Sequence, residues 1–178
     1  MLTFQQIARK LRTTDGAEIA EAALVLPLVF MLLLGIVWFG RAFNIYSTIQ
    51  QAAQQGAITA ARPTCATCGN APPGDTTVTN TISAVMQASS LNDPIPANNN
   101  PPTPKSCVDP FPVLTCPPTG NINICHQALL NDPLPTGQPA QCGTIVSFQY
   151  PFKFYLPFTS LNLSQITLSA QAQSRMEN

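Results

Sequence analysis

The stretch Ala22–Gly40, AALVLPLVFMLLLGIVWFG, decides how this chain is built, because its 19 residues include no charged side chain. As an α-helix rising about 1.5 Å per residue it would extend about 28 Å, close to the thickness of a bilayer's hydrocarbon core. A secretory signal peptide is one alternative, but its apolar run usually has about 7–15 residues and precedes a small-residue cleavage site, which is missing here. A buried helix of a soluble protein is the other, and 19 uninterrupted apolar residues disfavour it. The sequence therefore predicts a membrane-spanning helix.

The charged residues around this run predict its orientation. Arg9, Lys10 and Arg12 precede the apolar run, and Arg41 follows it. Because basic residues are retained on the cytoplasmic side, we expect a single-pass protein with its N-terminus inside and the remaining chain outside.

Two residues are unusual for a plain anchor. Glu21 stands at the start of the apolar run, where an ionised carboxylate either reaches the interface or needs a cationic partner. Pro27 removes one backbone hydrogen bond from the helix and favours a kink. Position alone leaves both interpretations of Glu21 open.

Residues 16–28, GAEIAEAALVLPL, resemble the N-terminal signature of the TadE-like proteins, the minor pilins or pseudopilins of bacterial tight-adherence (Flp) pili. The shared pattern is a basic leader, a glycine, a glutamate five residues later and a proline in the apolar run. The chain departs from it at Ala22, where the family usually has Phe. The resemblance implies that a prepilin peptidase cuts after Gly16 and leaves Ala17 as the new N-terminus. It also implies that Glu21 pairs with the free amine of a neighbouring subunit.

The resemblance further implies a location and a set of partners. The chain would lie in the inner (cytoplasmic) membrane, with a periplasmic or extracellular head. Its partners would be the lipid bilayer, other pilin or pseudopilin subunits, pilus-assembly membrane proteins and a prepilin peptidase. No cofactor is expected.

The helical pattern continues past the membrane span, which we place at about residues 22–40. Pro63 ends the pattern, so we expect a basic leader over residues 1–16 and one helix over residues 17–62. One face of its second half is apolar or small: Ile45, Ile49, Ala52, Ala53, Gly56, Ala57 and Ala60. The small residues would let another helix, or the chain's own head, approach closely.

Residues 63–142 hold 15 of the 18 prolines and all 6 cysteines, and we expect a loop-rich head there. A short helix is predicted at about residues 76–91, with Asp75 or Thr76 as its cap. The cysteines are Cys65, Cys68, Cys107, Cys116, Cys125 and Cys142. An even number outside the cytoplasm predicts up to three disulfides, whose pairing the sequence leaves open.

Other chemistry at these cysteines has little support. Cys65 and Cys68 form a CxxC, but no strand precedes it and no helix N-terminus follows to lower a thiol pKa. A zinc ribbon would need a second CxxC, which is missing, so no metal site is expected. His126 is the only histidine, and we expect it to be a surface or hydrogen-bonded residue.

The last segment, residues 143–178, predicts an antiparallel strand pair. Apolar residues alternate from Val146 to Leu156 and again from Ile166 to Ala172. Each strand then has one apolar face, which the helix over residues 17–62 could cover. Pro151 places the first strand at an edge or a bulge.

Composition excludes several classes of protein. Charged residues make up 9% of the 178 residues, with 8 Lys+Arg against 8 Asp+Glu, whereas a soluble domain carries about 25%. A nucleic-acid binder would need a basic surface, which this balance excludes. The chain also lacks a phosphate-binding loop and a dinucleotide glycine pattern, so we expect no catalytic residues.

The sequence thus predicts an α+β protein with a long membrane and stalk helix and a small, disulfide-linked head. We expect a structural pseudopilin or minor pilin that takes part in pilus assembly. The alternatives are an uncleaved single-pass scaffold protein of the same system and a membrane-tethered periplasmic thiol-redox protein that uses Cys65 and Cys68.

Overall fold

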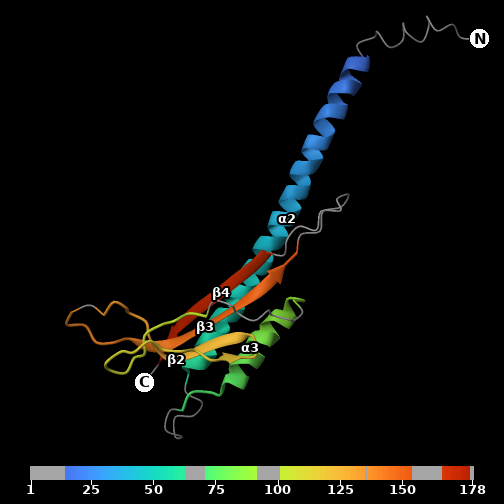
Figure 1. Ribbon diagram of the computed structural model, residues 1–178. Helices are drawn as coiled ribbons and strands as arrows, with labels where there is room; N and C mark the ends of the chain where they lie inside the picture. Colours follow the sequence, from blue (N-terminus) through green and yellow to red (C-terminus); the bar gives the residue numbers. More distant parts are fainter. Residues whose placement is uncertain (1–14, 63–70, 92–100, 135, 154–165, 177–178) are drawn as a thin grey trace, which may run out of the picture. The chain divides into compact units, whose positions relative to one another are not determined.

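The computed structural model describes residues 15–62, 71–91, 101–134, 136–153 and 166–176. The chain divides into two compact units, Met1–Ala42 and Phe43–Asn178. We call residues 15–42 the anchor segment and the second unit the head. Helix α2 runs from Asp15 to Ala61 and contributes to both units (Figure 1). The predicted α+β fold, with a long N-terminal helix and a disulfide-linked head, is confirmed.

The head contains a second helix and an antiparallel sheet. Helix α3 is Asp75–Ala88. The strands are β1 Pro118–Thr119, β2 Ile122–Leu129, β3 Cys142–Phe152 and β4 Ile166–Arg175. They pair in the order β1-β2-β3-β4, and every pair is antiparallel. The predicted strand pair corresponds to β3 and β4, while Phe154 and Leu156 lie outside the described residues.

Strand β2 was missed in the Pro- and Cys-rich region, where we expected loops. Its inward residues Ile122 and Ile124 are buried, but so are its outward residues Asn123 and Cys125. Both faces of β2 are covered, so it lacks the alternation of apolar and polar residues that marks a half-exposed strand.

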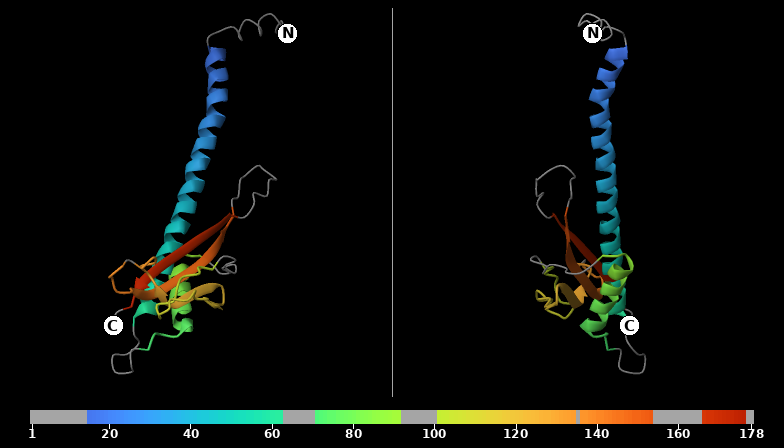
Figure 2. Two further views of the ribbon diagram at one scale, coloured as in Figure 1. Left: turned by 60° about the vertical axis from the view of Figure 1, so that its left-hand side comes forward. Right: turned by 90° about the vertical axis from the view of Figure 1, so that its right-hand side faces the viewer.

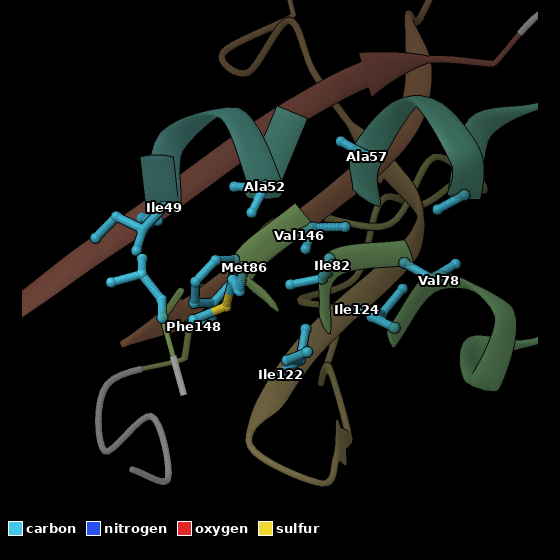
Figure 3. Packing of buried hydrophobic residues seen from close by; sticks show 14 residues of the cluster. Ile49, Ala52, Ala57, Val78, Ile82, Met86, Ile122, Ile124, Val146 and Phe148 are labelled. Atoms are coloured by element: carbon cyan, nitrogen blue, oxygen red, sulfur yellow. The ribbon is translucent and has the colours of Figure 1, made fainter. Parts of the chain in front are cut away.

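The main core lies between one face of the sheet and the two helices. Both views in Figure 2 show α3 and the head part of α2 on the same side of the sheet. Figure 3 shows the side chains that meet there: Ile49, Ala52 and Ala57 from α2, Val78, Ile82 and Met86 from α3, and Ile122, Ile124, Val146 and Phe148 from the sheet. The small-residue face of α2 therefore packs against the chain's own head, which answers the question that the sequence left open.

Gly56 marks a close approach between the two helices. A Cβ at this position would lie 2.7 Å from both Cδ1 and Cγ1 of Ile82, nearer than carbon atoms normally pack. Glycine here lets α3 sit against α2.

Strand β3 lies between β2 and β4, so it is not the edge strand that Pro151 predicted, and the prediction holds only locally around Pro151. β3 pairs with β2 only as far as Phe148, whereas it pairs with β4 as far as Phe152. Along β3, the backbone N–H and C=O groups of successive residues point alternately toward β4 and toward β2. Those of Pro151 point toward the β2 side. Its missing N–H therefore leaves no ladder hydrogen bond unmade.

A smaller core covers part of the other face of the sheet. Cys116, Cys125, Ala128 and Ile145 are buried there, and Leu114 and Leu130 pack against them. The disulfide Cys116–Cys125 belongs to this cluster. It ties the segment before β1 to β2, which explains why β2 is covered on both faces.

Candidate functional site on the N-terminal helix

The anchor segment presents an apolar surface along its length. Leu24 is 73% exposed and Phe39 is 76% exposed, and most of the large apolar side chains between them are similarly open. By length and composition the helix is able to cross a membrane. Apolar exposure on this scale is unfavourable in water and favourable in lipid, so the segment is a candidate membrane anchor.

The predicted processing residues lie in the first turns of α2. The helix begins at Asp15, so Gly16 and Ala17 belong to its first turn. Glu21 is exposed, and within the described residues it forms no ion pair. The geometry leaves this carboxylate available to a partner, but cleavage after Gly16 and pairing at Glu21 stay predictions.

Pro27 lies inside α2 and does not end the helix, which runs on without a break to Ala61. Because Pro27 has no N–H, the carbonyl of Ala23 loses its usual helical donor. Transmembrane helices tolerate such a gap. The predicted kink stays a prediction.

Arg41 and Trp38 mark the far end of the anchor segment. The Arg41 guanidinium lies 5.8 Å from the centroid of the Trp38 ring, within the range of a cation–π contact. A Trp–Arg pair of this kind suits the membrane–water interface, where the ring remains in an apolar layer and the charge remains hydrated.

The start of α3 differs from the prediction. Gly74, and neither Asp75 nor Thr76, is the N-cap, and no side chain caps the helix. The Asp75 carboxylate instead binds outside its own helix: Oδ1 lies 2.8 Å from His126 Nε2, and Oδ2 accepts a hydrogen bond of 3.0 Å from the Thr119 hydroxyl. The predicted local cap is therefore wrong, and the Asp75 carboxylate makes tertiary contacts with β1 and β2.

His126 is hydrogen-bonded, as predicted. It is also partly buried, and its Nδ1 atom has no hydrogen-bond partner within the described residues. The trio of Asp75, Thr119 and His126 fastens the N-terminus of α3 to β1 and β2. We assign this trio a structural role, because Asp75 lies between the other two residues and, among the residues that the structure describes, no hydroxyl hydrogen-bonds to the imidazole as a nucleophile would.

Four of the six cysteines form disulfides in the described residues. Cys107 pairs with Cys142, with Cα atoms 5.6 Å apart, and Cys116 pairs with Cys125, with Cα atoms 4.9 Å apart. These two pairings were left open by the sequence. Cys65 and Cys68 lie outside the described residues. Within the described residues, no group of three His, Cys, Asp or Glu side chains could hold a metal ion.

Comparison with known proteins finds a similarity in the N-terminal part of the chain. Residues 16–57 match the family described as TadE-like protein. This stretch is similar to TadE-like proteins. The match begins at Gly16, the predicted processing residue, and ends at Ala57, within the small-residue face of α2. No curated protein and no solved structure gives a significant match.

The TadE-like match concerns α2 and leaves the later part of the head, with β1–β4 and both disulfides, outside it. The family suggests a component associated with the tight-adherence pilus, and it is generally structural. The sequence did not predict that β4 is the edge strand of the sheet or that a polar groove lies beside it, because both depend on the order in which the strands pair.

Proposed function

We propose that the protein is a non-catalytic pseudopilin or minor pilin that is anchored in the inner membrane and takes part in assembling a tight-adherence pilus. One observation carries the proposal: a single TadE-like helix has an open apolar surface in its anchor segment and a small-residue surface packed into the head in its second half. Such a helix joins a membrane anchor to a folded outer domain without a linker.

The proposed processing step follows from the start of this helix. A prepilin peptidase would hydrolyse the peptide bond after Gly16 on the cytoplasmic side and release the basic leader. Ala17 would then carry a free amine, four residues before Glu21. In a neighbouring subunit, the Glu21 carboxylate would receive this amine as an ion pair. Two charges that are costly to bury singly become tolerable as a pair, and the pair would set the axial register of the two helices.

Intact mass after co-expression with a prepilin peptidase tests the processing step. We expect the wild-type chain to lose residues 1–16 and the Gly16→Ala variant to keep them. Gly35→Ala is the matched control, since it makes the same substitution in the same helix and its Cβ would meet nothing within 4 Å. An intact wild-type chain would favour the alternative, an uncleaved scaffold protein of the same membrane system.

Charge neutralisation at Glu21 tests the pairing. We expect Glu21→Gln to reduce the number of pili in a complementation assay while leaving membrane insertion unchanged. Glu18→Gln is the matched control, because Glu18 is also exposed and lies one turn earlier in α2. Equal effects of the two substitutions would argue against a specific partner for Glu21.

The thiol-redox alternative makes a different prediction at the two cysteines outside the described residues. A redox protein would lose its activity when Cys65 and Cys68 are both replaced by Ser, whereas a structural pilin would still support assembly. The same complementation assay separates the two, and loss of assembly together with normal levels of the variant would favour the redox protein.

A further inference from the structure

The two edges of the head sheet are built differently. The β1 edge is short and contains Pro118. Beyond β1, the segment Lys105–Cys107 covers β2: the Lys105 carbonyl accepts from the Leu129 N–H, and the Cys107 N–H donates to the Gln127 carbonyl. The other edge is β4, Ile166–Arg175, which pairs with β3 on one side and, within the described residues, with no strand on the other. One edge is therefore closed and the other open.

The direction of the backbone groups of β4 follows from two hydrogen bonds. The Met176 N–H donates to the Cys142 carbonyl, so even-numbered residues face β3 and odd-numbered residues face the open edge. Consistently, the carbonyl of Ser169 accepts from the side chain of Gln50 at 3.4 Å, across that edge. Within the described residues, the outward backbone groups of Thr167, Gln171 and Gln173 make no hydrogen bond, and all three residues are exposed.

The open edge lacks the features that usually prevent strand addition. Proteins protect long edges with lysine, proline, bulges or inward-pointing charges. From Ile166 to Ser174 the strand has no charged residue and no proline, and its ten-residue pairing with β3 is free of bulges. The chain thus protects its short edge and leaves its longest edge available.

A polar groove runs beside this edge on the sheet face away from the helices. It has a volume of about 420 Å³. Its floor contains two cross-strand pairs, Ser147 with Gln171 and Gln149 with Ser169, and residues 101–103 form part of its lining. None of the lining residues is charged. Side chains of an added strand that faced this groove would meet amides and hydroxyls.

We propose that β4 accepts a fifth strand, an extended and uncharged polar segment of another polypeptide. Along the open edge, outward N–H and C=O groups recur at every second residue. An extended polypeptide strand presents its own N–H and C=O groups at the same spacing, so it can pair with them. The groove then selects uncharged polar side chains, since a charged group would lose hydration there without a countercharge. The weak hydrogen bond from Gln50 gives way to the incoming backbone. This inference uses only the head and does not depend on the pilin proposal.

A second copy of this chain is the other polypeptide to consider at this edge. In Figures 1 and 2, β4 and the head part of α2 run in the same general direction. Antiparallel pairing of β4 with a second β4 would generate a two-fold axis and reverse the head part of α2 in the second copy. A second copy at this edge would therefore bring two heads together with the head parts of α2 antiparallel, and the test below treats it as a separate outcome.

The test uses the full chain in detergent micelles and a peptide of about nine residues that alternates threonine with glutamine or serine. Hydrogen exchange measures the exchange rates of the β4 backbone amides as the peptide is added. We expect saturable protection, above about tenfold, at the outward residues Thr167, Gln171 and Gln173. The same peptide with alternate amides N-methylated, so that it cannot donate to the edge, should give no protection. A peptide in which glutamate replaces the glutamines should bind at least about tenfold more weakly.

Variants of β4 separate the backbone contact from side-chain effects. Gln171→Pro removes an outward N–H and no hydrogen bond to β3, so the peptide should lose protection while the β3-facing amides remain protected. Gln171→Ala keeps the N–H and should still bind. Ser169→Lys provides a second block should the proline variant lose its fold.

Three results would overturn the proposal. These are no protection at millimolar peptide, equal protection by the N-methylated peptide, and unchanged binding by both Gln171→Pro and Ser169→Lys. Protection that grows with the concentration of the chain alone, without peptide, would identify a second copy as the occupant and overturn the choice made here.

Discussion

The contact between Gly56 and Ile82 gives the sharpest prediction for the head. In Gly56→Ala, the added methyl group would lie about 1 Å too close to Cδ1 and Cγ1 of Ile82, given their 2.7 Å separation from the Cβ position. Ile82 is fully buried, so its side chain can move away only if the side chains packed around it also shift. Overpacking of this kind costs about 1–3 kcal/mol.

Helix propensity acts in the opposite direction. Alanine stabilises the interior of a helix by about 1 kcal/mol relative to glycine. We therefore expect Gly56→Ala to lower the free energy of unfolding of the head by roughly 0–2 kcal/mol. Because this net value is small, the decisive quantity is how it changes when Ile82 is shortened.

Replacing Ile82 by Ala removes both clashing atoms and costs about 2–5 kcal/mol by leaving a cavity. In that background, the methyl group of Gly56→Ala enters vacant space, and the same substitution should stabilise by about 1 kcal/mol. The sign of the effect reverses, and the coupling between the two sites should be about 1–3 kcal/mol.

Pulse proteolysis of the full chain across a urea series, in micelles, measures the four free energies of unfolding. Gly40→Ala is the matched control, because it lies in the same helix with nothing within 4 Å of its Cβ position, and it should show no coupling to Ile82. If Gly56→Ala has the same effect in both backgrounds, the close approach of α2 and α3 described here is wrong.

Three further predictions concern the head, each measured by the same urea series. Gly143→Ala should destabilise by about 2–4 kcal/mol, since its Cβ would collide with the backbone carbonyl of Ser174, which moves only with β4; an unchanged midpoint would contradict the register of β3 and β4. Loss of the disulfide Cys116–Cys125, whose cysteines are 9 residues apart in the sequence, should lower the free energy of unfolding by roughly 3 kcal/mol. An unfolding midpoint that is the same with and without a reducing agent would contradict this. Asp75→Ala should lower the free energy of unfolding by about 1–3 kcal/mol, because it removes the hydrogen-bond partner of Thr119 and His126. Fast amide hydrogen exchange should then appear first in α3.

The N-terminal half of the protein could be predicted from the sequence because its physics is local. A run of 19 uncharged residues determines a membrane-length helix without any tertiary partner, and the order of Gly16, Glu21 and Pro27 carries the TadE-like resemblance that residues 16–57 confirm. The strand pair was also predictable, because apolar residues recur at every second position along both β3 and β4. β4 keeps one exposed face, whereas β3 is buried on both faces from Gly143 to Phe148, which its sequence did not indicate.

Tertiary structure decided the rest of the head. Strand β2 shows no clear alternation, because the cluster around Cys125 covers its second face. Asp75 caps nothing, because His126 and Thr119 reach it from sequence positions 51 and 44 residues away. The pairing of four cysteines depends on which Cα atoms the sheet brings within about 6 Å, which spacing along the chain does not encode.

The sequence by itself determined that this protein has a membrane-length apolar helix at its N-terminus and a weakly charged, cysteine-bearing remainder, since charge, hydropathy and residue order are properties of the chain alone. Only the fold decided that the small residues in the second half of α2 are buried inside the head, and that β4 has an open backbone edge among the residues that the structure describes. Both depend on which surfaces meet, and a surface is free or covered only after the whole head has packed.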